Sequence, residues 1–252
     1  MICTTESRAL VIALARSFAN DARPTTDDVF MTWIKICGIT NLEDALTAVE
    51  AGADAVGFVF YEKSPRRVDP DTVRRIVQEL PAGIEKVGVF VNQTEDSICR
   101  TAEQAGLSGI QLHGDNEDPH VADLVAERAG LKIFAAIAMN RPNPQGWAMT
   151  WRPDVVHGFL LDSGGSSMLG GTGRTFDWHA SVEGIGVIKR LGNVVVAGGL
   201  NPGNVREAIQ VTNPWGVDVS SGVESKPGKK DPEKIRAFVK AVREMDNANS
   251  RN

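Results

Sequence analysis

From Trp33 onward the chain repeats one unit: a short apolar run rich in Val, Ile, Phe and Ala, then turn residues, then a stretch of about a dozen residues with helical spacing. Near-continuous apolar runs are typical of parallel strands that are buried on both faces. Eight alternating strand–helix units that close on themselves form a (β/α)8 barrel, which is the fold class we expect. The predicted strands are Trp33–Cys37, Asp54–Phe60, Glu85–Val91, Gly109–His113, Lys132–Ala138, Val155–Asp162, Asn193–Ala197 and Gly216–Ser220.

The segments between these runs predict helices, several of which begin with a capping residue or with Pro in the first turn. The connection from Met139 to Pro153 is rich in Pro, Asn and Trp, so we expect a degenerate helix or a loop there. A doubly wound open sheet shares the alternation, but it usually has fewer strands and a dinucleotide-binding fingerprint after the first one. The predicted helices are Asn41–Ala51, Pro70–Leu80, Thr94–Ala105, Asp118–Ala129, Pro202–Val211 and Asp231–Met245.

Residues 1–31 lie outside the repeat, so we expect an N-terminal extension followed by a barrel domain over 32–252. Leu10, Leu14 and Phe18 have helical spacing and could form the apolar face of a short helix, which Pro24 would end. We expect a poorly ordered extension or an upstream start codon, with Met31 as the alternative first residue. The alternative is a helix that docks on a partner or on the barrel itself.

Charge and cysteine content exclude several classes of protein. The chain has 27 Lys and Arg against 32 Asp and Glu, a net charge of -5, which is the wrong sign for holding a nucleic-acid backbone. Its three cysteines, without CxxC spacing, argue against a disulfide framework and a structural zinc site. The longest apolar run near the start, Ala9 to Ala15, is too short for a membrane helix and has poor signal-peptide flanks. We expect a cytoplasmic protein.

Polar residues gather at the ends of five predicted strands. The carboxyl ends of barrel strands surround one mouth, where the active sites of such barrels lie, so we expect these residues to converge. They are Cys37-Gly38, Ser64-Pro65-Arg66-Arg67 (in the loop after the second strand), His113-Gly114, Asp162-Ser163 and Asp218-Val219-Ser220-Ser221-Gly222.

Cys37 is a candidate base because of its place at the end of the first strand. Strand alternation puts Trp33, Lys35 and Cys37 on one face. If that face lines the barrel, the Lys35 ammonium lies one layer below the thiol. Its positive charge would favour the thiolate and lower the pKa of the thiol from its unperturbed value of about 8.5. The alternative is core packing, since free Cys is among the most buried residue types.

Asp162 ends an otherwise apolar strand, where partial burial would raise the pKa of its carboxyl and let it donate a proton near neutral pH. It could instead be a helix cap or an ion-pair partner. Arg66 and Arg67 are candidates for binding a carboxylate bidentately, with Arg66 pointing inward and Arg67 outward, or else a solvated surface pair. His113 either orients a substrate or hydrogen-bonds the strand end.

Three glycine-rich loops in the second half predict a phosphate site. Glycine lets backbone N–H groups approach an anion closely, and barrels commonly bind phosphate in the loops after the seventh and eighth strands. The alternative is that these glycines only make tight turns. The loops are Gly170-Gly171-Thr172-Gly173, Gly198-Gly199-Leu200-Asn201-Pro202 and Ser220-Ser221-Gly222.

Over residues 33 to 242 the chain resembles the phosphoribosylanthranilate isomerase family. The motifs that carry the resemblance are short, but their number and order are specific. They are Lys35-Ile36-Cys37-Gly38-Ile39-Thr40, Gly57-Phe58-Val59-Phe60, Ser64-Pro65-Arg66, Gly88-Val89-Phe90-Val91, Gln111-Leu112-His113-Gly114, Leu161-Asp162, Gly170-Gly171-Thr172-Gly173, Phe176-Asp177-Trp178, Ala197-Gly198-Gly199-Leu200 and Gly216-Val217-Asp218-Val219-Ser220-Ser221-Gly222-Val223-Glu224. The N-terminal extension and the connection after the fifth strand depart from the family pattern.

The resemblance implies a cofactor-independent Amadori rearrangement in tryptophan biosynthesis, which converts N-(5-phosphoribosyl)anthranilate into 1-(o-carboxyphenylamino)-1-deoxyribulose 5-phosphate. It implies Asp162 as the general acid, Cys37 as the general base and Arg66 as the ligand of the anthranilate carboxylate. Backbone amides around Thr172, Gly199, Ser221 and Gly222 would hold the phosphate. Apart from the resemblance, we expect Asp218 to pair with Lys35 or to tune Cys37.

Two other functions remain open from the sequence. A dual-substrate isomerase of the histidine and tryptophan pathways shares the fold and the phosphate loops, but its pattern has two aspartates as the acid and the base. Cys37 at the end of the first strand argues against this alternative. A catalytically inactive phosphate-binding barrel could act through its extension as an interaction module. The expected binding partner is a small phosphosugar substrate. We expect binding to neither nucleic acid nor a membrane, and we expect the chain to be a monomer or a homodimer.

Overall fold

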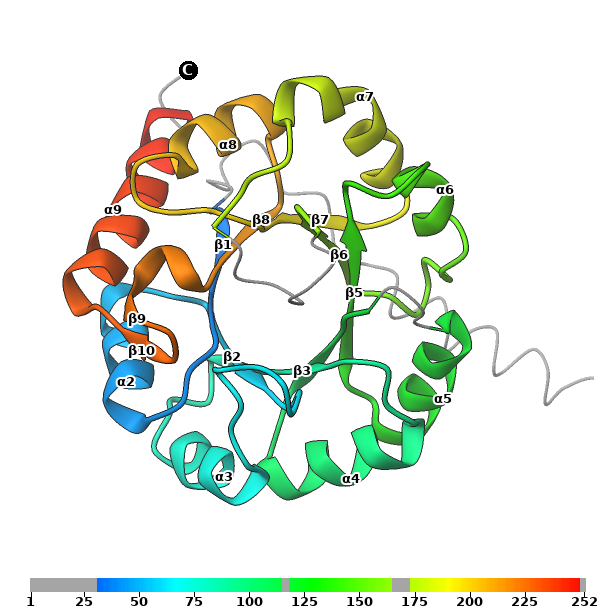
Figure 1. The fold of residues 1–252 in the computed structure, drawn as a ribbon, viewed down its shortest axis with the longest axis vertical. Helices are drawn as coiled ribbons and strands as arrows, with labels where there is room; N and C mark the ends of the chain where they lie inside the picture. Colours follow the sequence, from blue (N-terminus) through cyan, green and yellow to red (C-terminus); the bar gives the residue numbers. More distant parts are fainter. Residues whose placement is uncertain (1–30, 115–117, 165–172, 250–252) are drawn as a thin grey trace, which may run out of the picture. The chain divides into compact units, whose positions relative to one another are not determined.

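The computed structural model describes residues 31–114, 118–164 and 173–249. Its core is a closed barrel of eight parallel strands in sequence order (Figure 1), so the predicted (β/α)8 fold is confirmed. Each predicted strand overlaps an observed one within a few residues at either end. The strands are β1 (Trp33–Cys37), β2 (Ala55–Val59), β3 (Glu85–Phe90), β4 (Gly109–Leu112), β5 (Lys132–Ala138), β6 (Gly158–Asp162), β7 (Asn193–Val196) and β8 (Gly216–Val219).

Helices alternate with the strands and surround the barrel (Figure 1). Side-chain caps begin most of them: for example, Asp69 accepts a hydrogen bond from the Thr72 amide, and Asp177 accepts one from Ala180. The helices are α2 (Leu42–Ala51), α3 (Pro70–Gln78), α4 (Glu95–Ala105), α5 (Pro119–Ala129), α6 (Pro144–Ala148), α7 (Trp178–Ile188), α8 (Val205–Thr212) and α9 (Pro232–Asn249). The five-residue α6 is the degenerate helix expected after the fifth strand.

Three elements were not predicted. Helix α7 has two glycines and several β-branched residues, which weaken the helical signal. The strands β9 (Glu224–Lys226) and β10 (Lys229–Lys230) form an antiparallel hairpin that follows β8 and a short 3-10 turn, Ser221–Val223. These strands are short and mostly charged, so they carry no apolar alternation to reveal them.

The core has two parts. The larger lies between the sheet and the helices, and the smaller fills the inside of the barrel. Inside, Trp33 at the start of β1 stacks on Phe134 and Trp215, with ring centroids 5.4 and 5.1 Å apart. These rings fill the barrel at the amino ends of its strands, and a pocket is left towards the carboxyl ends.

The predicted extension spans residues 1–31, of which residues 1–30 lie outside the described part of the chain. Within residues 31–114, 118–164 and 173–249, no helix is long and apolar enough to cross a membrane.

Candidate active site

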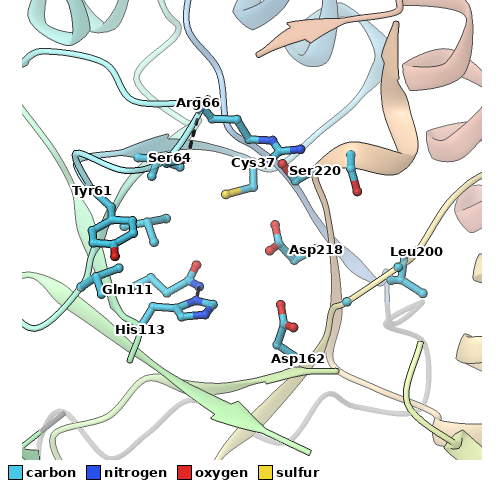
Figure 2. Close-up of a pocket in the computed structure, with 16 residues that line it drawn as sticks. Cys37, Tyr61, Ser64, Arg66, Gln111, His113, Asp162, Leu200, Asp218 and Ser220 are labelled. Carbon is cyan, nitrogen blue, oxygen red and sulfur yellow. Dashed lines mark hydrogen bonds between the residues drawn. The ribbon is translucent and has the colours of Figure 1, made fainter. Parts of the chain in front are cut away.

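A pocket opens at the carboxyl ends of the strands, where the sequence predicted a site (Figure 2). Seven of the nine predicted site residues line it: Cys37, Arg66, His113, Asp162, Gly199, Asp218 and Ser221. Gly222 is next to Ser221 in the short turn after β8, and Thr172 lies outside the described residues. The other lining residues are Val59, Tyr61, Ser64, Val89, Val91, Gln111, Gly198, Leu200 and Ser220.

Cys37 ends β1 and is buried with its thiol facing the pocket (Figure 2). One layer below it on the same face lies Lys35, only 1% exposed, as strand alternation predicted. Lys35 Nζ lies 2.7 Å from Asp218 Oδ1, because Lys35 on β1 is in register with Asp218 on β8. The predicted pairing of Asp218 with Lys35 is therefore confirmed.

The electrostatic environment of Cys37 differs in part from the expectation. Burial raises the pKa of the Cys37 thiol, and the cationic Lys35 and Lys230, which lower it, do not fully compensate. Burial lowers the pKa of Lys35, but the Asp218 carboxylate and Cys37 outweigh it, so the pKa of Lys35 is raised and the ammonium stays charged. The lysine favours the thiolate as predicted, while desolvation leaves the thiol less acidic than a free one.

Asp162 ends β6 and points into the same pocket from another wall (Figure 2). Its Oδ1 accepts hydrogen bonds from the Gly164 amide at 3.0 Å and from Ser163 Oγ at 3.3 Å. These two contacts fix one carboxylate oxygen locally. They orient the carboxyl group at the mouth, where a proton donor would need to be.

Arg66 points inward and is 9% exposed, whereas Arg67 is exposed, so the predicted split of the pair is confirmed. The Arg66 guanidinium is already paired within the protein: Nε and Nη2 each donate to Glu224 at 2.8 Å. Glu224 also accepts from Lys230 Nζ at 3.0 Å. Burial raises the pKa of Glu224, but the hydrogen bond from Arg66 and the charge of Lys230 outweigh it and hold that pKa below its ordinary value.

His113 follows β4 and lines the pocket beside Gln111. Gln111 Nε2 lies 3.2 Å from His113 Nδ1, and Gln111 Oε1 accepts from Lys35 Nζ at 3.0 Å. His113 is therefore joined through Gln111 to the ion pair below Cys37.

The glycine-rich loops after β7 and β8 meet at the pocket. Gly198 and Gly199 have φ of +74° and +69°, which only glycine adopts readily, and the Gly199 carbonyl accepts from Asn204 Nδ2 at 3.0 Å. A Cβ at Gly222 would collide with the carbonyl oxygen of Leu200. Gly222 is thus required by the close approach of the two loops, and Gly198 and Gly199 by their backbone conformation, whatever anion the loops bind.

Three residues that hydrogen-bond to the predicted site residues received no predicted role: Gln111, Glu224 and Lys230. Gln111 shares a strand face with His113, so period-two alternation could have placed it at the pocket. Glu224 reaches Arg66, and Lys230 reaches Glu224, only through the hairpin after β8, for which the sequence carries no signal. Among the described residues, no cluster of three His, Cys, Asp or Glu side chains could hold a metal ion.

A barrel of this topology, with a thiol, a carboxyl and an arginine facing one pocket at its mouth, defines the class of (β/α)8-barrel enzymes. Residues 34–241 match the family model for N-(5'-phosphoribosyl)anthranilate (PRA) isomerase. The chain belongs to this isomerase family.

Similar proteins of this name are known from several bacteria. The N-(5'-phosphoribosyl)anthranilate isomerase of Geobacter sp. (strain M21) is 46% identical over 216 residues, covering 85% of this chain and 100% of that protein. The Thermotoga maritima enzyme is 45% identical over 210 residues, covering 83% and 98%. A crystal structure of the Thermotoga maritima isomerase has a TM-score of 0.77, with 43% identity over 85% of this chain and 100% of that one.

Another solved phosphoribosyl anthranilate isomerase, in complex with reduced 1-(o-carboxyphenylamino)-1-deoxyribulose 5-phosphate, has a TM-score of 0.74 and 43% identity over 85% of this chain and 100% of that one.

Proposed function

We propose that this chain catalyses the Amadori rearrangement of N-(5-phosphoribosyl)anthranilate to 1-(o-carboxyphenylamino)-1-deoxyribulose 5-phosphate, a step of tryptophan biosynthesis. The observation that carries the proposal is that Cys37 and Asp162 face one pocket from two strands, with Arg66 on its wall (Figure 2). An aldose-to-ketose rearrangement needs an acid and a base at different points of one sugar. The family membership supports the same reaction.

In the proposed mechanism, the Asp162 carboxyl protonates the furanose ring oxygen, and the bond between that oxygen and carbon one breaks to give an open-chain Schiff base. The Cys37 thiolate then removes the proton from carbon two, which yields an enolamine. Tautomerisation of the enolamine gives the ketone. No electrons leave the substrate, so the rearrangement proceeds without a redox cofactor. Each proton transfer contributes roughly 10²- to 10⁴-fold to the rate.

The two ends of the substrate, the anthranilate carboxylate and the phosphate, are anions that need hydrogen-bond donors. The guanidinium of Arg66 binds the anthranilate carboxylate through the edge that Glu224 does not cover. Backbone amides around Gly199, Ser221 and Gly222, together with Thr172, hold the phosphate. Asp218 and His113 contact the ribose between these two ends, since both line the same pocket.

The proposal includes a cytoplasmic location and a monomeric or homodimeric chain. A reducing compartment suits Cys37, which is a free thiol in the structure. Among similar structures, one is described as monomers generated from a dimeric phosphoribosylanthranilate isomerase of Thermotoga maritima, which supports leaving both states in the proposal.

Turnover of phosphoribosylanthranilate by the purified chain tests the proposal. Cys37→Ser and Asp162→Asn should each lower kcat by at least about 100-fold while still binding the reduced product analogue. Cys99→Ala is the matched control, because this thiol is buried on α4 outside the pocket, and it should keep full activity. Turnover of the histidine-pathway phosphoribosyl substrate as well would instead favour the dual-substrate isomerase. Binding of the analogue without any turnover would favour a binding module.

A further inference from the structure

Four side chains form one continuous row of hydrogen bonds from beneath the thiol to the pocket wall. Asp218 Oδ1 lies 2.7 Å from Lys35 Nζ, and Lys35 Nζ donates to Gln111 Oε1 at 3.0 Å. Gln111 Nε2 then lies 3.2 Å from His113 Nδ1. Asp218, Lys35 and Gln111 are 8%, 1% and 3% exposed, so little water competes for these contacts.

The row fixes the orientation of the Gln111 amide. The Lys35 ammonium can only donate, so it must face the carbonyl oxygen of the amide rather than its nitrogen. The amide nitrogen of Gln111 can also only donate, and it therefore faces a ring nitrogen that accepts. Turning the amide over would set two donors against each other at Lys35.

The same constraint fixes the proton on His113. A neutral imidazole has one nitrogen that donates and one that accepts. Because Nδ1 accepts from Gln111, the proton lies on Nε2. An imidazolium would carry a second proton on Nδ1, opposite the Gln111 amide donor, and the row disfavours it for that reason.

We propose that Gln111 is a positioning residue which holds His113 as a neutral imidazole with its proton on Nε2, so that His113 donates a hydrogen bond to a ribose oxygen of the bound phosphosugar. For its ligand this inference rests on the proposed function. His113 then acts as a fixed donor and takes no proton from the substrate. Lys35 serves two groups at once: it stabilises the Cys37 thiolate from below and orients the Gln111 amide.

A neutral donor suits this pocket chemically. Asp162 and Cys37 already supply one acid and one base, and a further basic group beside the sugar would compete with Cys37 for protons. A hydrogen bond from Nε2 holds a ribose oxygen in position without transferring its proton. His113 and Gln111 lie side by side on one wall of the pocket, across from Cys37 (Figure 2).

The tautomer is measurable on the full chain without any substrate. The sequence has only four histidines, so the imidazole nitrogens of ¹⁵N-labelled protein are resolvable by two-bond proton–nitrogen correlation NMR. His113→Gln assigns the His113 signals by their loss. We expect Nδ1 unprotonated and Nε2 protonated at pH 7 and above. A proton on Nδ1, or an imidazolium at pH 7, would overturn the proposal whether or not the chain turns over phosphoribosylanthranilate.

A pair of substitutions tests the donor in turnover. His113→Gln carries an amide that reaches the Nε2 position, while His113→Asn carries the same amide one methylene shorter. We expect kcat to fall in both variants, at least about tenfold in His113→Asn, the range for losing one hydrogen bond, and by a smaller factor in His113→Gln. Equal losses in both variants would count against a donor at Nε2.

Gln111→Glu tests the positioning role itself. A carboxylate beside Nδ1 accepts a hydrogen bond, so it should move the proton of His113 to Nδ1 or create the imidazolium, which NMR reads directly. We expect kcat to fall at least about tenfold with KM changed less than threefold. An unchanged His113 tautomer in this variant would show that Gln111 does not set it.

Discussion

Glu224 and Arg66, 158 residues apart in the chain, meet through two hydrogen bonds of 2.8 Å, from Nε and Nη2 of the guanidinium to the two oxygens of the carboxylate. This contact covers one edge of the planar guanidinium and leaves the edge formed by Nη1 and Nη2 for a second carboxylate. Arg66 lines the pocket, whereas Glu224 lies behind it. Glu224 therefore aims the arginine at the place where the anthranilate carboxylate binds in our proposal.

Glu224→Gln should weaken substrate binding more than it slows the chemistry. An amide can accept only one of the two guanidinium hydrogen bonds, and a charge-assisted bond is worth about 1.5–3 kcal/mol, so KM should rise about tenfold or more with kcat changed less. Steady-state kinetics with phosphoribosylanthranilate measure the split. Glu43→Gln, at an exposed carboxylate that pairs with Lys229, is the control and should leave both constants unchanged. A loss confined to kcat would contradict a positioning role for Glu224.

The same ion pair predicts how stability depends on pH. The pKa of Glu224 in the folded chain is below its ordinary value of 4.5, because the Arg66 hydrogen bond and the Lys230 charge outweigh burial. Its contribution to the free energy of unfolding is therefore present above about pH 4.5 and is lost as the pH falls through the lower, folded pKa. Urea unfolding at pH 7 and pH 3.5 should show a larger acid loss for the parent chain than for Glu224→Gln. Equal losses would mean that Glu224 is not linked to folding.

Removing the cation below the thiol should shift the pH dependence of the reaction. Lys35 lowers the pKa of Cys37, although burial leaves that pKa raised overall, so Lys35→Met should raise it further. The alkaline rise of kcat/KM and the rate of Cys37 alkylation, followed by mass spectrometry of its peptide, should both move to higher pH. Lys35→Met combined with Asp218→Asn avoids an unpaired buried carboxylate and should shift in the same direction. An unchanged apparent pKa of Cys37 would sink the idea.

The fold and much of the site could be predicted because they depend on local patterns. Buried parallel strands are continuous apolar runs, and strand alternation alone placed Lys35 and Cys37 on one face. The barrel closes β8 onto β1, so pairing Lys35 with Asp218 required only the order of the strands.

What the sequence could not predict depends on packing between distant loops. Glu224 reaches Arg66 because the hairpin of β9 and β10 brings them together, with the Gly228 carbonyl accepting from Thr40 Oγ1 at 2.7 Å. Likewise, the net effect on the pKa of Cys37 depends on how completely the folded barrel removes water from the thiol. No motif or residue spacing predicts the contact between Glu224 and Arg66 or the extent to which the Cys37 thiol is desolvated.

Gly57 should be irreplaceable because it makes room for the thiol. It lies on β2 in register with Cys37 on β1, and a Cβ at position 57 would lie 2.7 Å from Cys37 Sγ. Gly57→Ala should therefore displace the thiol, lower kcat at least about tenfold, and cost about 1–3 kcal/mol of unfolding free energy from overpacking. Gly83→Ala is the matched control, because a Cβ there meets nothing within 4 Å. Full activity of Gly57→Ala would show that the thiol position is not critical.

A chain that starts at Met31 should keep the activity and nearly all the stability of the full chain. We propose residues 1–30 as a dispensable extension, since the chain from Met31 onward forms one compact unit and its eight strands close without them. The first residues of that unit are fixed from within it: the Thr32 amide and hydroxyl both donate to Asp246 on α9, at 3.2 and 2.6 Å, and Arg243 donates to the Thr32 carbonyl. Thermal unfolding and kcat/KM of the two chains are compared directly. Asp246→Ala in the shorter chain should be destabilised by about 3 kcal/mol, because it leaves Arg243 without one buried carboxylate partner and Thr32 without its acceptor. A large loss of stability on removing residues 1–30 alone would overturn the view that the barrel is complete without them.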